Sequence, residues 1–216
     1  MQNIQKKQLI IFDMDGTLID SGDTISNTVN FVRKNLGLEP LPKKELLDNM
    51  NNPEINSSEF FYGTTLFTDE QTELFTQYYN TNCTKDIILY EGIYELIKEL
   101  SNHFTLSIAT NASANFAKKM IKHLNIDIYF EFIIGSTDVS FPKPHPEMLL
   151  STLQTLDINI KNSILIGDSN KDKKAAVACN MDYLLVNWGF SEHDINIDNS
   201  VIKNTQELHK KLMRLQ

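Results

Sequence analysis

The chain has 216 residues, enough for one core with a smaller accessory subdomain. Hydrophobic residues make up 41% and charged residues 22% of it, which excludes collagen-like, low-complexity and largely disordered proteins. With 28 acidic and 20 basic residues the formal net charge is -8, the wrong sign for sequence-independent binding to nucleic acid or anionic lipid. An anionic ligand must therefore meet a local positive site.

The two cysteines, Cys83 and Cys179, lie far apart and lack metal-ligand spacing, so we expect neither a disulfide framework nor a zinc site. No apolar run approaches the roughly 18 residues of a membrane-spanning helix, and residues 1–7 are too polar for a signal peptide. We expect a protein of the reducing cytoplasm, with no membrane and no nucleic acid among its partners.

Short apolar runs alternate with segments of helical period along most of the chain. Such runs are typical of strands that are buried on both faces. The alternation predicts an α/β fold, with a parallel sheet between helices and ligands at the carboxyl ends of the strands. The predicted strands are 8–12, 106–109, 132–134, 164–166 and 183–186, and the predicted helices of this part are 93–100, 116–124, 149–156 and 205–216.

The interval from residue 21 to residue 89 breaks this alternation, because it offers helical patterns without buried strands between them. Its first helix carries an apolar stripe from Ile25 to Leu36 and is predicted to end at Gly37. We therefore predict a helical cap subdomain at 21–89, inserted into an α/β core domain made of 1–20 and 90–216.

A later cap helix is predicted to begin at Thr68, where Thr68 and Gln71 have the spacing of a capping box. Between the cap helices, residues 49–53 are rich in turn formers and are predicted to form a loop that faces the sheet. The aromatic run at 60–62 is expected to pack the core of the cap itself.

The first predicted strand leads into the run Asp13-Met14-Asp15-Gly16-Thr17. In extended backbone, residues two apart point to the same side, so Asp13 and Asp15 can converge on one ligand. Two such carboxylates repel each other and need a cation or a shared proton. Gly16 permits a sharp turn and a close approach of the backbone. The alternative is a solvated turn after a strand.

Polar residues also follow the next two strands. Thr110 and Asn111 precede a helix that begins near Ser113, where a hydroxyl beside free N–H groups suits a phosphate oxygen; an ordinary helix cap is the alternative. Lys143 lies among three prolines, which predict a stiff extended loop that holds its ammonium for a phosphate. A solvated surface lysine is the alternative there. We do not expect His145 to act as an acid or base.

The fourth strand is followed by Gly167, Asp168 and, four residues later, Asp172. Carboxylates at the end of a strand suit Mg²⁺, which prefers a few hard oxygen ligands together with phosphate and water. With Asp13 they could form one octahedral site. Asp172 is equally typical of an acid in the first turn of a helix, where the helix dipole favours it.

Taken in this order, these segments resemble the haloacid dehalogenase superfamily of phosphotransferases. The resemblance covers nearly the whole chain, because the stretch 90–93 is also similar to the point where these proteins return to the core after a helical cap. It implies a Rossmann-like α/β core with an inserted helical cap. The segments that carry it are Asp13-Met14-Asp15-Gly16-Thr17, Thr110-Asn111, Lys143 and Gly167-Asp168 with Asp172.

The resemblance also implies roles for these residues. Asp13 would be the nucleophile that forms an aspartyl-phosphate, and Asp15 would protonate the leaving group and later activate water. Mg²⁺ would be the cofactor. The implied substrate-binding residues are Gly16, Thr110, Asn111 and Lys143, and the implied metal ligands are Asp13, Asp15 through its backbone carbonyl, Asp168, and Asp172 either directly or behind the other ligands.

The acid at Asp15 separates phosphatases from the dehalogenases of the superfamily, which lack one. The small cap resembles that of phosphoglycolate phosphatases and β-phosphoglucomutases, so we expect a Mg²⁺-dependent phosphatase whose partner is a small phosphorylated metabolite, phosphoglycolate-like or a sugar phosphate. A sugar-phosphate mutase, a nucleotidase and a noncatalytic phosphate-binding module stay open, as do a monomer and a homodimer. Only Lys43 and Lys44 lie near the predicted cap loop, and we identify no group for a substrate carboxylate.

Overall fold

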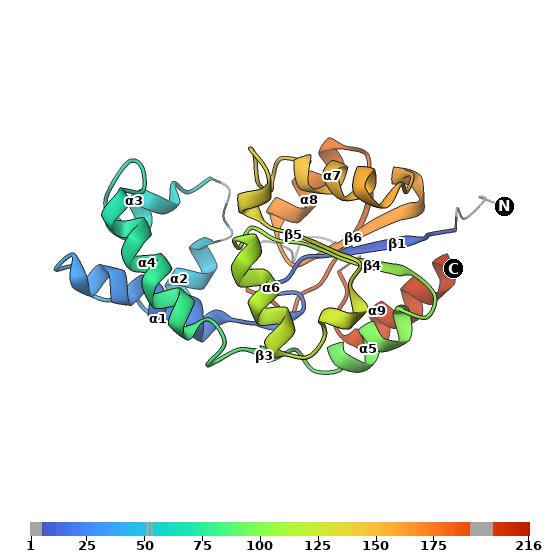
Figure 1. Ribbon diagram of the computed structural model, residues 1–216, viewed down its shortest axis with the longest axis horizontal. Coiled ribbons are helices and arrows are strands. Elements are labelled where there is room, and N and C mark those ends of the chain that lie inside the picture. Colours follow the sequence, from blue (N-terminus) through green and yellow to red (C-terminus); the bar gives the residue numbers. More distant parts are fainter. Residues whose placement is uncertain (1–5, 51, 53, 191–200) are drawn as a thin grey trace.

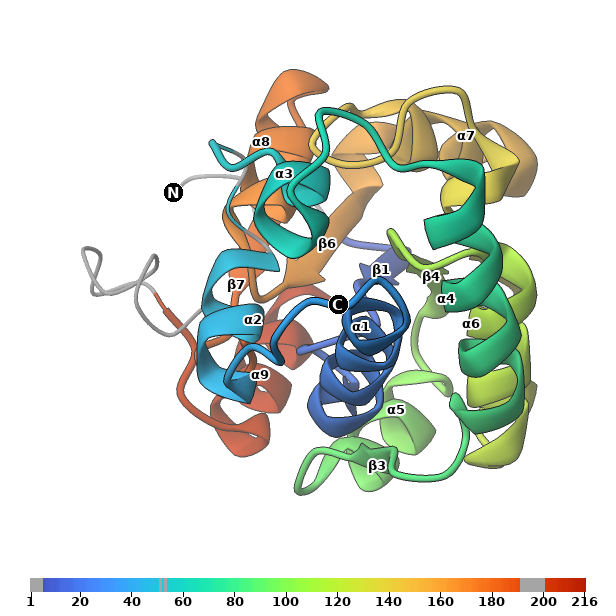
Figure 2. The ribbon, with the colours of Figure 1, turned by 90° about the vertical axis from the view of Figure 1, so that its left-hand side faces the viewer.

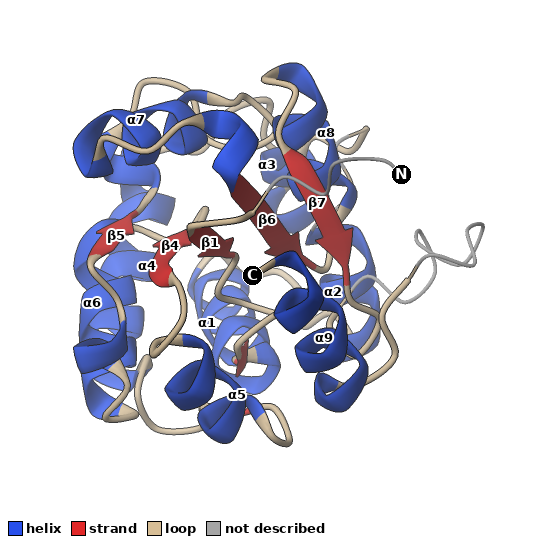
Figure 3. Cartoon of the chain, turned by 90° about the vertical axis from the view of Figure 1, so that its right-hand side faces the viewer, coloured by secondary structure: helices blue, strands red, loops and turns tan. Residues whose placement is uncertain are grey.

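The computed structural model describes residues 6–50, 52, 54–190 and 201–216. In this part of the chain, five strands form one sheet in the order β5-β4-β1-β6-β7 (Figure 3). All of its pairings are parallel, which confirms the predicted α/β fold. The strands are β1 (Leu9–Phe12), β4 (Thr105–Ala109), β5 (Phe132–Ile134), β6 (Ser163–Gly167) and β7 (Asp182–Leu185).

Helices cover both faces of the sheet (Figure 1). Alternate residues of a strand point to opposite faces, and in β1 Ile10 and Phe12 pack on one side while Leu9 and Ile11 pack on the other. All four are fully buried, and each such side chain contributes roughly 1.5–3 kcal/mol of burial free energy. The first face carries α5 (Ile93–Leu100), α6 (Ala114–His123) and α9 (Thr205–Leu212), and the second carries α7 (Glu147–Leu156) and α8 (Asn170–Ala178).

The register of the sheet decides what meets at its carboxyl edge. Phe12, the last residue of β1, lies beside Ile108 of β4 and Ile166 of β6. The residues that follow these three strands therefore emerge at one level of the same edge. Short 3-10 helices complete the described core at Asp127–Tyr129, Ser136–Asp138, Ile160–Asn162 and Met213–Leu215.

Four helices between β1 and α5 lie beside the sheet, and Figure 2 views the molecule from their side. They have an apolar cluster of their own, in which Val32, Leu46 and Phe61 are buried. Two short antiparallel strands, β2 (Ile19–Asp20) and β3 (Ile88–Leu89), lie where the chain enters and leaves this region. The helices are α1 (Gly22–Asn35), α2 (Lys43–Met50), α3 (Ser57–Tyr62) and α4 (Asp69–Asn82).

Most details predicted for these helices are confirmed. Thr68 and Gln71 form the predicted capping box, α1 ends just before Gly37, and the aromatic run at 60–62 packs in the cluster of this region. The predicted loop at 49–53 is wrong at its start, because Asn49 and Met50 belong to α2, whose apolar side packs into that cluster. Residues 51 and 53 lie outside the described residues. The division into core and cap at residues 21 and 89 stays a prediction.

Both cysteines have free thiols; Cys83 is buried and Cys179 partly so. Among the described residues we find no helix whose length and apolar character would let it cross a membrane.

Candidate active site

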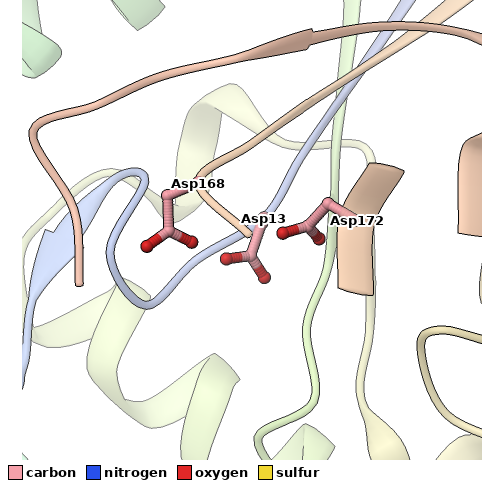
Figure 4. Close-up of side chains that lie close together, drawn as sticks. All are labelled: Asp13, Asp168 and Asp172. Atoms are coloured by element: carbon pink, nitrogen blue, oxygen red, sulfur yellow. The ribbon is translucent and has the colours of Figure 1, made fainter. Parts of the chain in front are cut away.

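Three aspartates meet at the carboxyl edge of the sheet (Figure 4). Asp13 directly follows β1, Asp168 directly follows β6, and Asp172 lies in the first turn of α8. One carboxylate oxygen from each lies within 4.8 Å of the others, and all three residues are buried. The parallel register thus brings together carboxylates that are more than 150 residues apart in the sequence.

Lys143 supplies positive charge to this cluster. Its Nζ lies 2.6 Å from Asp13 Oδ1 and 2.6 Å from Asp172 Oδ1, and its side chain is only 2% exposed. The alternative of a solvated surface lysine is therefore wrong. The ammonium neutralises part of the anionic charge that would otherwise be isolated in a medium of low polarity.

Asn111 and a turn hold Lys143 in place. The Asn111 side chain donates a hydrogen bond to the Lys143 carbonyl at 2.8 Å and accepts one from its backbone N–H at 3.0 Å. The loop is not extended as predicted, because a hydrogen bond of 3.0 Å from His145 N to the Pro142 carbonyl closes it into a turn, and the Lys143–Pro144 peptide is cis. The Asn111 amide thus positions Lys143, and its contact with substrate stays a prediction.

The turn after β1 orients Asp15. Gly16 has φ +86°, a conformation that glycine adopts without strain, and a Cβ there would lie 2.3 Å from Asp168 Oδ2. The turn lets Ser21 Oγ donate a hydrogen bond to Asp15 Oδ1. Asp15 therefore lies beside the carboxylate cluster but is held by its own partner, at the entry to α1.

Thr110 lies at the end of β4 and is 1% exposed. Its Oγ1 accepts a hydrogen bond of 3.1 Å from Ala112 N, and its hydroxyl also lies close enough to Asp15 to lower the pKa of that carboxyl by hydrogen bonding. Ser113 is the N-cap of α6 but makes no side-chain cap bond. The Thr110 hydroxyl is thus at the predicted edge, between Asp15 and the start of a helix.

Burial dominates the electrostatics of the acids. It raises the pKa of Asp13 to about 7, an effect that Lys143 opposes and Asp172 increases. Burial also raises the pKa of Asp168 well above its ordinary value, and that of Asp15, against the hydrogen bond from Ser21. Burial alone would lower the pKa of Lys143, but the carboxylates of Asp13 and Asp172 outweigh it and raise that pKa. Three carboxyl groups therefore share one ammonium, and a further positive charge would favour their ionised forms.

The hydrogen bonds of the cluster fit a divalent cation. Asp172 Oδ2 accepts from Ser169 N at 3.1 Å and from Ser169 Oγ, while its Oδ1 contacts Lys143. Asp168 Oδ2 accepts from Phe190 N at 2.9 Å, but Asp168 Oδ1 is buried with no hydrogen-bond donor among the described residues. A buried carboxylate oxygen without a partner is unfavourable, and a hard cation such as Mg²⁺ is the partner that it suits.

The loop after β7 packs against the turn that follows β1, a contact that the sequence did not predict. Trp188 Nε1 donates to the Thr17 carbonyl at 3.1 Å, and a Cβ on Gly189 would lie 2.2 Å from the Gly16 carbonyl oxygen. No local pattern could reveal this contact, because it joins residues 171 positions apart.

The sequence patterns did not identify two further residues beside the cluster, Ser169 and Lys171. Ser169 forms a capping box with Asp172, for which the Ser-x-x-Asp spacing was an available signal. Lys171 Nζ donates a hydrogen bond of 2.8 Å to the Met50 carbonyl at the end of α2, for which the sequence has no signal.

The model of the family described as haloacid dehalogenase-like hydrolase matches residues 10–186. The chain belongs to this family. A phosphoglycolate phosphatase of Colwellia psychrerythraea is 28% identical over 204 residues, covering 89% of this chain and 90% of the relative. One of Nitrosococcus oceani is 29% identical over 215 residues, covering 91% of each.

A solved structure of the family has the same fold. It is a haloacid dehalogenase-like hydrolase from Streptococcus pneumoniae, 29% identical, with a TM-score of 0.81 over 97% of this chain and 99% of that one. The family and these relatives identify the chain as an enzyme, a hydrolase of the phosphatase type.

Proposed function

We propose that the chain is a Mg²⁺-dependent phosphatase that hydrolyses a small phosphomonoester, phosphoglycolate-like or a sugar phosphate, through an aspartyl-phosphate on Asp13. The observation that carries the proposal is the position of Asp13, between the buried ammonium of Lys143 at 2.6 Å and the unpartnered oxygen of Asp168. The phosphoglycolate phosphatases among its relatives support the substrate class.

The chemistry follows from the two acids after β1. A carboxylate oxygen of Asp13 attacks phosphorus, the bond from phosphorus to the ester oxygen breaks, and Asp15 gives its proton to the departing alkoxide. Water then attacks the phosphorus of the aspartyl-phosphate, with Asp15 taking its proton, and phosphate leaves from a regenerated Asp13. The burial that raises the pKa of Asp15 favours the protonated form that the first step needs.

The remaining residues bind and orient. Lys143 and Thr110 would hold phosphoryl oxygens, and Asn111 keeps the Lys143 backbone in place. Mg²⁺ would be held by Asp13, Asp168 and the Asp15 carbonyl, with Asp172 behind them because Lys143 and Ser169 engage both of its oxygens. When bound, the cation supplies positive charge that screens the repulsion between carboxylate and phosphoryl group.

The test is phosphate release from a panel of small phosphomonoesters, including 2-phosphoglycolate, sugar phosphates and nucleoside monophosphates, with and without Mg²⁺. We expect release that requires Mg²⁺ and that falls by about 10³-fold or more in Asp13→Asn. Asp127→Asn, at an exposed residue, is the control and should keep full activity.

Full activity in Asp13→Asn, or no release from any compound, would overturn the proposal. A sugar phosphate that is returned isomerised instead of hydrolysed would favour the mutase, and a strict preference for nucleoside monophosphates would favour the nucleotidase.

A further inference from the structure

Lys171 lies where the core meets the helices α1–α4. It is the second residue of α8 and directly precedes Asp172 of the carboxylate cluster. Its Nζ reaches across to α2 and donates a hydrogen bond of 2.8 Å to the carbonyl of Met50, and Figure 2 shows α2, α3 and α8 on the same side of the molecule. The ammonium of Lys171 is therefore at the rim of the candidate active site.

No carboxylate among the described residues forms an ion pair with Lys171. The neighbouring Asp172 has both oxygens engaged by Lys143 and Ser169. A cation in the first turn of a helix also meets the positive end of the helix dipole, and Lys171 is half-buried. The stability of α8 therefore gives no reason for a lysine at this position.

The contact with Met50 uses only one of the N–H donors of the Lys171 ammonium group. The last carbonyls of a helix lack intrahelical partners and carry negative partial charge, so the Met50 carbonyl at the end of α2 is a suitable acceptor. An ammonium group has three N–H donors, and the structure gives one of them to Met50. Among the described residues the other two donors have no hydrogen-bond acceptor, so the ammonium can bind an anion at the rim of the site.

We propose that Lys171 is a specificity-determining residue that binds a carboxylate of the substrate. This inference rests on the proposed function, which places the phosphoryl group at Asp13 and Lys143. It narrows the substrate to a small phosphomonoester that also bears a carboxylate. Lys171 is then the carboxylate-binding group that the sequence does not identify.

A carboxylate fits this position better than a second phosphoryl group. One ammonium balances the single charge of a carboxylate, whereas a phosphate dianion needs a further cation. The lysines of α2 do not supply that further cation, because they form ion pairs with acids of their own region. Lys43 pairs with Asp23 at 2.9 Å and Lys44 pairs with Asp48 at 2.8 Å.

The experiment compares kcat and KM for 2-phosphoglycolate and for p-nitrophenyl phosphate, which has no carboxylate. The measured quantity is the ratio of kcat/KM for 2-phosphoglycolate to kcat/KM for p-nitrophenyl phosphate. We expect Lys171→Gln to lower this ratio by about ten- to hundredfold, mainly because the KM for 2-phosphoglycolate rises when a charge-assisted hydrogen bond is lost. Lys171→Arg keeps a cation and should restore most of the ratio.

Lys119→Gln is the matched control. Lys119 on α6 also donates to a backbone carbonyl of the other region, that of Asn80 on α4, so this variant removes the same kind of contact without touching the carboxylate cluster. It should leave the ratio unchanged. A second control, Lys174→Gln, removes an exposed lysine from α8 itself.

The outcomes separate the two proposals. If Lys171→Gln changes kcat/KM equally for both substrates, as is expected of Lys119→Gln, Lys171 is only a structural contact and the inference is wrong. If the unmodified enzyme hydrolyses p-nitrophenyl phosphate but not 2-phosphoglycolate, the inference is again wrong while the phosphatase stands. If it hydrolyses neither but releases phosphate from a sugar phosphate, the inference is wrong and the phosphatase stands; if no compound of the panel releases phosphate, both proposals fail.

Discussion

The ammonium of Lys143 contacts Asp13 and Asp172, both at 2.6 Å, and none of the three side chains is more than 10% exposed. A buried ion pair contributes little by itself, since desolvation offsets much of the attraction. Removing one partner has a far larger effect, because the remaining charges stay buried without compensation. We therefore expect Lys143 to stabilise this edge of the fold, in addition to the proposed binding of phosphate.

Lys143→Met should lower the free energy of unfolding by about 3–5 kcal/mol near pH 8 in the absence of divalent cations, and by less near pH 5. Burial raises the pKa of Asp13 to about 7 even with Lys143 present, and removing Lys143 raises it further. A carboxyl whose pKa is raised by folding contributes stability at low pH that is lost as the pH rises through the folded-state pKa. Urea unfolding in EDTA at both pH values measures the difference.

Lys7→Met is the control for this pH dependence. Lys7 is also buried, but its partner Asp182 is 69% exposed, so that carboxylate stays solvated when the lysine is removed. Its loss of stability should be similar at the two pH values. An equal loss at both pH values for Lys143→Met would contradict the assignment of Lys143 as the compensating charge.

Two helices begin with the same hydrogen-bond arrangement but in different places. Thr68 and Gln71 close a capping box at the start of α4, and Ser169 and Asp172 close one at the start of α8. The first box lies away from the carboxylates. The second holds one of them, so the same local motif stabilises a helix in one place and also positions a carboxylate in the other.

Thr68→Ala and Ser169→Ala should each lower the free energy of unfolding by about 1 kcal/mol, because each removes a helix cap. Only Ser169→Ala should also lower kcat/KM for phosphate release, by about tenfold or more, since it frees the Asp172 carboxylate that orients Lys143. Urea unfolding and initial rates of the two purified variants test this. Equal activity of the two would show that the α8 cap has no part in the site.

Individual elements differ in how far the sequence predicts them. The core strands were predicted because each is a short apolar run of the kind that is buried on both faces, and the core helices because their apolar residues recur with the helical period. The end of α2 was missed because Asn49 and Met50 have turn-forming neighbours, while the packing of Leu46 and Met50 in the cluster of this region holds the helix. The loop at Lys143 was predicted to be stiff, and only the contact with Asn111 and the turn of the chain set its course.

At the scale of the whole molecule, the sheet concentrates carboxylates at one edge, and a cation that binds only the folded chain must stabilise it. We expect Mg²⁺ at about 100 times its Kd to add about 2.7 kcal/mol and to raise the unfolding temperature by about 5–10 °C. Asp168→Asn should lose most of this rise, since Asp168 supplies the unpartnered oxygen. Thermal unfolding with Mg²⁺ and with EDTA is the measurement.

Asp127→Asn, at an exposed position, is the control and should keep the full rise in unfolding temperature. The same rise in Asp168→Asn as in the unmodified chain would place the cation elsewhere.

The sequence by itself determined the alternation of strands and helices and the edge at which the candidate residues meet. Burial of both faces of a strand or of one face of a helix gives a local pattern of apolar residues that the sequence shows directly. Parallel strands have their carboxyl ends on one edge of the sheet, so residues that follow successive strands come together there. Asp13, Thr110, Lys143 and Asp168 were found in this way, although their roles in catalysis stay predictions.

Only the tertiary structure decided which polar atoms of the site have hydrogen-bond partners and which have none. The unpartnered oxygen of Asp168, the contact of Trp188 with the turn after β1 and the reach of Lys171 to Met50 all depend on segments more than 20 residues apart. Such contacts follow from how helices and loops pack against the sheet and leave no periodic trace in the sequence. For the same reason, the sequence identifies no carboxylate-binding group, whereas the structure points to Lys171.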